Sequence, residues 1–133
     1  MAVKTFGAID VGSDEITLTI AECAKGRRIR VIDQVTHRIN LGTDTFLTGK
    51  IRYGHVAELK KLLGEYRRIM DNYGVTEYKA YGTSAIREMV NRTVVLSEIE
   101  QQTGIHIDTL SNSEQRFLDY KSIAAKGEGF ARI

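Results

Sequence analysis

The stretch from residue 6 to residue 20 constrains the fold more than any other part of the chain. An apolar segment runs into Asp10, a turn passes through Gly12 and Ser13, and apolar residues then alternate with threonine up to Ile20. This alternation is the period of a β-strand with one buried face, and a short glycine-containing turn between two such strands indicates a hairpin. The sequence therefore predicts two antiparallel strands with a carboxylate near their connecting turn.

The same turn has the composition of a binding site for phosphate and a cation. Gly12 allows left-handed backbone angles and the close approach of a ligand, and the amides around Gly12 and Ser13 are able to converge on a phosphate oxygen. Asp10 supplies the hard oxygen ligand that Mg²⁺ or another divalent cation prefers. An ordinary hairpin, in which the Asp and Ser side chains satisfy their own turn, explains the same four residues, so both interpretations stay open for the turn alone.

The composition is that of one globular domain. The chain has 133 residues, which is enough to bury a core, and its formal net charge of +2 without runs of like charge gives no indication of a nucleic-acid partner. A single cysteine, Cys23, excludes an internal disulfide, and no apolar run approaches the length of a membrane span. We therefore expect a cytoplasmic protein without nucleic-acid or membrane partners, in which Cys23 is a buried thiol.

Hydrophobic periodicity and glycine positions divide the rest of the chain into elements. Strands are expected within residues 28–41, 75–81 and 105–109, a loop from 42 to 50, and helices at 55–73, 85–91, 93–103 and 111–125. Three strands joined by tight turns form an antiparallel meander, and the later strand–helix–strand order implies a right-handed parallel crossover. The predicted fold is α/β: a mixed five-stranded sheet, made of the meander plus two parallel strands, with helices on both faces. One lobe of the ribonuclease H-like, or actin-like ATPase, fold is built in this way.

Two later segments, at residues 82–87 and 111–114, are further candidates for the functional site. Gly82, Thr83 and Ser84 end a strand and open a helix, where free amides and the helix dipole favour an anion, and Arg87 follows one turn later, in reach of a phosphate. A plain helix N-cap with a solvated Arg87 is the alternative. Ser111 and Glu114 have the spacing of a capping box, and on spacing alone that structural interpretation is favoured.

These segments, in this order, resemble the N-terminal domain of the exopolyphosphatase and guanosine pentaphosphate phosphatase family, Ppx/GppA. The matching residues are 10–13, 82–88 with Asn91 and Arg92, and 110–114, and residues 38–42 add a further similarity. The resemblance implies that Asp10 holds a divalent cation such as Mg²⁺ and that Glu114 is the general base that activates the attacking water. The phosphate-binding residues that it implies are Gly12, Ser13, Thr83, Ser84 and Arg87.

The chain departs from the family pattern at the first and last of these segments. Asp14 and Glu15 stand where the family usually has neutral Asn-Ser, and Thr17 stands where it has a basic residue or histidine. Asn112 and Gln115 replace the usual Gly and Glu. Additional carboxylates beside a phosphate site repel a polyanion unless a cation bridges the two. The substitutions leave open whether this member catalyses hydrolysis or has a shifted specificity.

The resemblance implies that residues 1–133 form one lobe of a longer, two-lobed protein, whose second lobe follows and completes the active-site cleft. The implied activity is hydrolysis of a terminal phosphoanhydride of inorganic polyphosphate or guanosine pentaphosphate by metal-assisted attack of water. A non-catalytic module that binds or senses these compounds is the main alternative, and a sugar kinase or chaperone-type ATPase lobe is a further one. A homodimer is compatible with the full-length protein, and the isolated chain is expected to be inactive.

Overall fold

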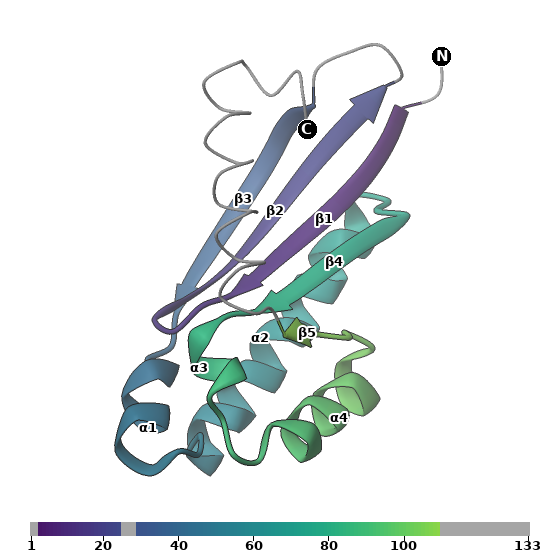
Figure 1. Cartoon of the computed structure of the whole chain (residues 1–133). Coiled ribbons are helices and arrows are strands. Elements are labelled where there is room, and N and C mark those ends of the chain that lie inside the picture. Colours follow the sequence, from purple (N-terminus) through teal and green to yellow (C-terminus); the bar gives the residue numbers. More distant parts are fainter. Residues whose placement is uncertain (1–2, 25–28, 110–133) are drawn as a thin grey trace.

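The computed structural model describes residues 3–24 and 29–109 (Figure 1). The tight turn expected before the strand within residues 28–41, and the helix expected at residues 111–125, lie outside these ranges. The elements, in chain order, are β1 (Val3–Val11), β2 (Glu15–Ala24), β3 (Arg30–Arg38), α1 (Leu41–Thr48), α2 (Tyr53–Asn72), β4 (Glu77–Gly82), α3 (Ser84–Arg87), α4 (Arg92–Thr103) and β5 (Asp108–Thr109).

The strands form one mixed sheet with the order β3-β2-β1-β4-β5. β2 pairs antiparallel with both β1 and β3, whereas β4 runs parallel to β1 and β5 runs parallel to β4. An antiparallel meander extended by parallel strands is the arrangement predicted for a ribonuclease H-like lobe, so that prediction is confirmed. Val11 stands opposite Gly82 in the parallel pair, and β1 and β4 therefore end at the same edge of the sheet.

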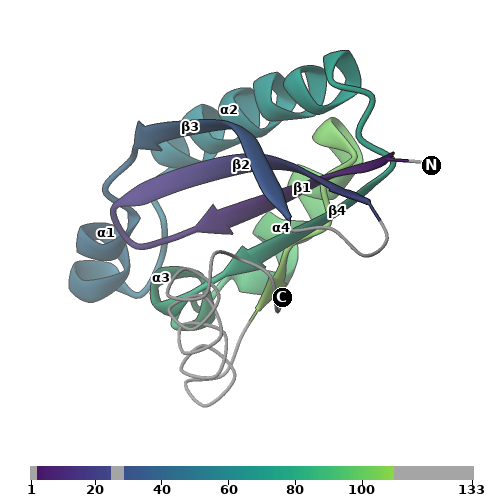
Figure 2. The ribbon, with the colours of Figure 1, turned by 90° about the horizontal axis from the view of Figure 1, so that it is seen from above.

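The core lies between one face of the sheet and the helices α2 and α4. Alternate positions of β1 and β2 bury their side chains toward this face, and Figure 2 shows α2 lying along it. The cluster contains Ile9, Val11, Ile16, Leu18 and Ile20 from the strands, Leu59, Leu63, Tyr66 and Met70 from α2, and Val95 and Ile99 from α4. That helices cover both faces of the sheet stays a prediction.

The helix α1 occupies the segment for which a loop was expected. Asn40 caps its start, because the Asn40 Oδ1 atom accepts hydrogen bonds from the Thr43 amide at 3.2 Å and from the Thr43 hydroxyl at 2.8 Å. Gly49 ends it in the left-handed conformation, with φ of 75°. The expected ends of the longer helices are confirmed, since Gly74 and Gly104 also have positive φ.

Other differences are smaller. α3 ends at Arg87, earlier than the expected helix, and β5 contains only the last residues of its expected strand. Cys23 is half-buried in β2, where full burial was expected. Within the described ranges, none of the helices is both long enough and apolar enough to cross a membrane.

Gly82 is required where α3 packs back onto the end of β4. A Cβ atom at this position would lie 2.7 Å from both Cβ and Cγ2 of Ile86, a side chain that is completely buried. Distances below 3.0 Å force one of the atoms to move. The glycine therefore lets the chain turn directly from the sheet into α3.

Gly82→Ala is expected to lower the free energy of unfolding by about 1–3 kcal/mol, because overpacking of a full core displaces Ile86. Gly64→Ala is the matched control: this glycine lies inside α2 with nothing within 4 Å of an added Cβ. The control should raise stability by up to ~1 kcal/mol through helix propensity. Urea unfolding followed by circular dichroism measures both, and equal effects in the two variants would refute the packing argument.

Candidate functional site

Three segments that are distant in the sequence meet at the carboxyl end of β1. The Thr83 amide donates to the Val11 carbonyl at 3.1 Å, and the Gly42 amide donates to the Ser13 carbonyl at 2.7 Å. The Ile39 amide also donates to the Asp14 carbonyl at 3.2 Å. The turn between β1 and β2 is thus held between the start of α3 and the start of α1 (Figure 1).

Gly12 closes the turn with its own backbone. Its amide donates to the Glu15 carbonyl at 2.9 Å. The left-handed glycines of the described ranges are Gly49, Gly74 and Gly104, so Gly12 does not use the left-handed conformation that glycine allows. A Cβ atom at Gly12 would approach the Glu15 carbonyl oxygen to 3.0 Å. The Gly12 amide therefore forms a hydrogen bond within the hairpin. Gly12 would contribute to a ligand site only by leaving space beside the turn, because it has no side chain.

The structure places Thr83 beside this turn, and Arg87 follows one helical turn later in α3. Thr83 is only 8% exposed, and its hydroxyl donates to the Val11 carbonyl at 3.4 Å, while the Arg87 amide donates to the Thr83 carbonyl at 2.9 Å. The α3 helix begins at the next residue, Ser84. The Arg87 guanidinium Nε lies 3.5 Å from Oε1 of Glu88, and its side chain keeps 19% of its surface exposed.

Asp10 projects from the sheet face opposite the core. Its neighbours Ile9 and Val11 are fully buried, and because strand side chains alternate, the exposed Asp10 points the other way. In the described part of the chain no group of three or more His, Cys, Asp or Glu side chains is arranged to hold a metal. A single carboxylate still fits Mg²⁺, which keeps several waters and is commonly held by one or two carboxylates together with substrate phosphates.

One of the two unusual acids in the turn is paired. The Arg38 guanidinium donates to the Asp14 carboxylate at 2.8 Å, and both side chains are largely exposed. The pair follows from the strand register, which sets Arg38 opposite Glu15. Its positive charge offsets part of the repulsion that Asp14 and Glu15 would exert on a phosphate.

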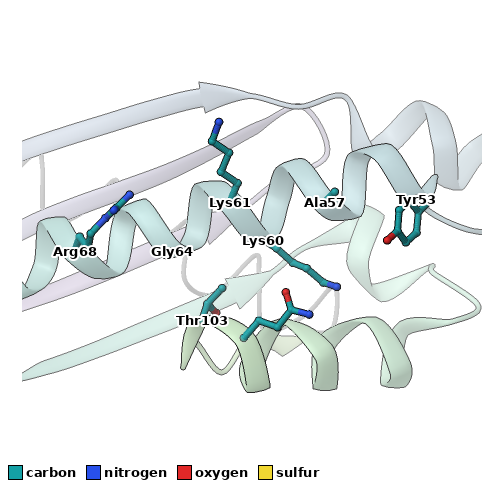
Figure 3. A pocket seen from close by; sticks show the side chains of 8 residues that line it. Tyr53, Ala57, Lys60, Lys61, Gly64, Arg68 and Thr103 are labelled. Atoms are coloured by element: carbon teal, nitrogen blue, oxygen red, sulfur yellow. The ribbon is translucent and has the colours of Figure 1, made fainter.

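Two surface depressions differ in their relation to the turn. One of about 360 Å³ adjoins it and is lined by Ser13, Gly42, Thr45, Phe46, Ala85 and Glu88. Another of about 560 Å³ lies along α2 and α4, contains no residue of the turn, and is lined in part by Lys60, Lys61 and Arg68 (Figure 3). In Figure 3, Lys60 extends toward α4, whereas Lys61 and Arg68 extend from the other side of α2. Lys60 is already paired with Glu98 at 2.9 Å.

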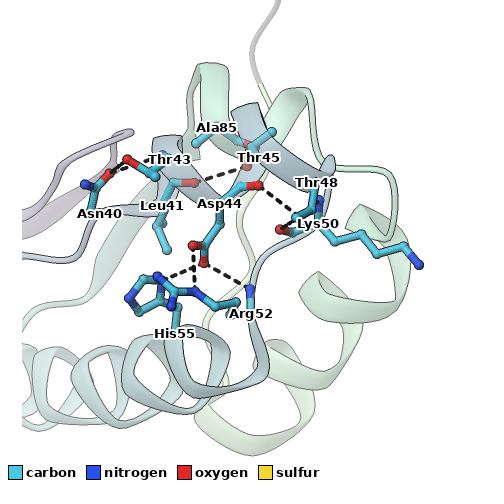
Figure 4. Close-up of polar contacts among 10 residues, drawn as sticks. All are labelled: Asn40, Leu41, Thr43, Asp44, Thr45, Thr48, Lys50, Arg52, His55 and Ala85. Atoms are coloured by element: carbon cyan, nitrogen blue, oxygen red, sulfur yellow. Dashed lines mark hydrogen bonds and ion pairs between the residues drawn. The ribbon is translucent and has the colours of Figure 1, made fainter.

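A buried carboxylate fixes α1 to the start of α2 (Figure 4). The Asp44 side chain is 2% exposed, accepts hydrogen bonds from the Arg52 amide at 3.0 Å and from Arg52 Nε at 2.9 Å, and lies 2.6 Å from Nδ1 of His55. Burial raises the pKa of Asp44, but the hydrogen bonds from Arg52 and His55 outweigh burial and hold that pKa below its ordinary value. The position of α1, and with it the Gly42 contact to the turn, depends on this ionised group.

The model of the Ppx/GppA phosphatase family matches residues 19–126, which is most of the chain. The chain belongs to this family. The match includes the segments at Ile39, Gly42 and Thr83 that contact the turn, and it extends past the last described residue.

Named relatives of this Ppx/GppA chain agree with the assignment. Exopolyphosphatase 1 of Mycobacterium leprae is 26% identical over 117 residues, which are 88% of this chain and 34% of the relative. Exopolyphosphatase 2 of Mycobacterium tuberculosis is 28% identical over 129 residues, which are 91% of this chain and 40% of the relative. The crystal structure of the Aquifex aeolicus family member superposes with a TM-score of 0.86 at 26% identity, over 92% of this chain and 40% of that one. The chain thus spans about a third to two fifths of these relatives.

For this Ppx/GppA chain, the structure brings together two of the three segments singled out in the sequence. Thr83 is bonded to Val11 at the start of the turn, Ser13 lines the same depression as Ala85 of α3, and Asp10 lies one residue before the end of β1. Glu114 lies outside the described residues. The contacts of Arg38 and Asp44 were not found from the sequence, because both depend on how distant elements pack. The roles of the site residues in binding and catalysis remain predictions.

Asp44→Asn is expected to lower the free energy of unfolding at pH 7 by about 1–3 kcal/mol, because the amide cannot satisfy the same buried donors. Since the folded-state pKa of Asp44 is depressed, its stabilisation is present above the unfolded pKa of about 3.9 and is lost as the pH falls through the lower folded value. The difference between wild type and variant should therefore shrink in acid.

Asp71→Asn is the control for this test, because Asp71 is exposed and lies 3.7 Å from Arg67. Its effect should stay within about 0.5 kcal/mol at every pH. The measurement is the urea midpoint of unfolding of each protein from pH 7 to pH 3. A difference in midpoint between Asp44→Asn and wild type that stays constant with pH would contradict the role of the ionised carboxylate.

Proposed function

We propose that this chain is the N-terminal lobe of a phosphoanhydride hydrolase that removes the terminal phosphate of inorganic polyphosphate or guanosine pentaphosphate. The observation that carries the proposal is the junction at which the β1–β2 turn meets the start of α3, through the bond from the Thr83 amide to the Val11 carbonyl. Family membership and two relatives named exopolyphosphatase support the reaction class.

The geometry narrows which groups would bind phosphate. The amides of Gly12 and Thr83 are engaged in backbone hydrogen bonds, so the contacts would come from Ser13, from the first turn of α3 beginning at Ser84, and from Arg87. Arginine suits this role because its planar guanidinium matches phosphate oxygens. Arg38, paired with Asp14, reduces the negative potential around the turn.

The proposed chemistry is a displacement at phosphorus. Glu114 takes a proton from a water molecule, the water oxygen bonds to the terminal phosphorus, and the bridging P–O bond breaks, which releases inorganic phosphate and a chain shorter by one unit. A divalent cation such as Mg²⁺, held with the help of Asp10, supplies charge neutralisation on the phosphates when bound. Besides supplying Glu114, the lobe would orient the terminal phosphate against the turn.

A non-catalytic sensing module remains the second candidate. Asp14 and Glu15 favour it, because they stand beside the proposed phosphate site where the family of hydrolases usually has neutral residues. The proposal places the protein in the cytoplasm, an expectation supported by a composition with a single cysteine. A homodimer of the full-length protein belongs to the same proposal.

The isolated 133-residue chain is expected to release no measurable phosphate from tripolyphosphate with Mg²⁺, because the second lobe would supply the other half of the phosphate and cation contacts. Adding the second lobe, in one polypeptide, should restore release. A colorimetric phosphate assay on both forms tests this. Sustained turnover by the chain alone would overturn the division into lobes.

Glu114→Gln in the two-lobed protein is expected to lower the rate of phosphate release by about 10²–10⁴-fold, the usual contribution of a general base. The substrates to compare are polyphosphate and guanosine pentaphosphate. Glu98→Gln is the matched control, because Glu98 pairs with Lys60 on α4 and α2, outside the proposed site. Equal rates in Glu114→Gln and wild type would show that Glu114 is not the general base. Ligand binding without turnover in wild type would favour the sensing module.

A further inference from the structure

His106 lies between two carboxylates where the chain passes from α4 to β5. Its Nδ1 atom is 2.7 Å from Oε1 of Glu100, in the last turn of α4, and its Nε2 atom is 3.1 Å from Oδ1 of Asp108, at the start of β5. An ionised carboxylate only accepts hydrogen bonds, and a neutral imidazole has a single N–H to donate. Both contacts are therefore hydrogen bonds at the same time only when the ring is protonated on both nitrogens.

A tyrosine joins the same connection to the neighbouring strand. The Tyr78 hydroxyl, from β4, donates to the Gly104 carbonyl at 3.0 Å and accepts from the His106 amide at 3.1 Å. Ile105 and Ile107, on either side of His106, are buried in the core. These contacts fix the backbone at residue 106, so the His106 ring is held where α4, β4 and β5 meet (Figure 1).

β5 depends on contacts of this kind because it is short. It has two residues, which pair with Tyr81 and Gly82 of β4, and it stands at the end of the strand order. Local opening costs least at such positions, where few backbone hydrogen bonds hold the chain. Gly82 directly precedes Thr83, whose amide bonds to the Val11 carbonyl, so β5 borders the strand end that forms the candidate site.

We propose that His106 is a pH-dependent clamp. Its imidazolium form joins Glu100 of α4 to Asp108 and holds β5 against β4, whereas its neutral form keeps only one of the two bonds and loosens the pairing of β5. The proposal goes beyond the proposed function, since it depends only on contacts within this lobe. It makes the sheet edge beside the candidate site more ordered in acid than in base.

The two carboxylates set the pH at which the clamp opens. The hydrogen bond with Glu100 raises the pKa of His106 above its ordinary value, partial burial acts against this, and Asp108 adds to the increase. Because the folded-state pKa is raised, the stabilisation is fully present below the unfolded pKa of about 6.5 and is lost as the pH rises through the folded value. The side chains of His106, Glu100 and Asp108 are 61%, 53% and 49% exposed, so salt should weaken the clamp.

Cations on the adjoining elements oppose the protonated ring. Arg92, at the start of α4, lines the same depression as His106, but its guanidinium donates to a backbone carbonyl of α3 at 2.9 Å. Lys79 of β4 is two residues from the first position that pairs with β5, and Arg67 of α2 lies 5.6 Å from the centre of the Tyr78 ring. The carboxylates are within hydrogen-bonding distance of the imidazole, so their attraction outweighs this repulsion.

The test is an NMR titration of the 133-residue chain from pH 5 to pH 9 with two readouts. The carbon-bound ring protons of His106 report its pKa, which should lie above the ordinary value of about 6.5. Hydrogen exchange, corrected for the intrinsic effect of pH, gives the protection of the amides of residues 105–109. This protection should fall by about fivefold as the pH passes the pKa of His106, in line with the loss of an exposed ion pair.

Substitutions of exposed side chains separate the clamp from a purely structural role. Glu100→Gln should lower the pKa of His106 and move the loss of protection to lower pH. His106→Gln should give low protection that does not change across this range. His37→Gln is the matched control, because His37 also pairs with a glutamate, Glu58, at 3.3 Å, but on β3 at the other end of the strand order. It should leave residues 105–109 as they are in wild type.

The result that supports the clamp is a fall in protection that follows the pKa of His106 in both wild type and Glu100→Gln. A His106 pKa at or below 6.5, or protection that stays constant while His106 titrates, would overturn it. A pH-dependent fall that persists in His106→Gln would assign the effect to another group and would overturn it as well. None of these outcomes depends on whether the protein hydrolyses a phosphoanhydride.

Discussion

The parallel pairing of β1 with β4 is the constraint on which the rest of the structure depends. It sets Val11 opposite Gly82, so that the turn after β1 and the helix after β4 emerge at the same edge of the sheet. The bond from the Thr83 amide to the Val11 carbonyl continues this pairing one residue beyond the strands. In open sheets with parallel strands, ligands characteristically bind at such carboxyl ends. The candidate site follows from the topology before any side chain is considered.

A second interaction that positions the site is the ion pairing of Asp44. α1 carries few buried side chains of its own, and Asp44 connects it to α2 through Arg52 and His55. A buried carboxylate is costly unless its acceptor positions are filled, and here three donors surround it. Through Gly42, the same helix holds the Ser13 carbonyl. The geometry of the turn thus depends on an ion-paired group two residues along α1 from Gly42, and this dependence connects stability to the shape of the site.

The sequence was sufficient to predict the sheet and the long helix, because strand alternation in residues 6–20 and helical periodicity in residues 55–73 are strong, local signals. It was insufficient for α1. Its threonines and glycine are weak helix formers, so the capping signals of Asn40 and Gly49 had no periodic apolar pattern between them to support a helix. The order of the motifs identified the two described segments that meet at the carboxyl end of β1. The hydrogen bonds that occupy the Gly12 and Thr83 amides and the pairing of Arg38 with Asp14 arise from tertiary packing, which no local pattern encodes.

The central claim is that the β1–β2 turn and the start of α3 bind the same phosphate, which Glu114 faces. The most direct measurement is a crystal structure of the two-lobed protein with Mg²⁺ and a non-hydrolysable phosphoanhydride analogue. The account predicts a terminal phosphate in hydrogen-bonding contact with both Ser13 and the segment 84–87, with the carboxylate of Glu114 on the same side. A phosphate bound elsewhere, or a Glu114 carboxylate that opens onto a different surface from Ser13, would contradict it.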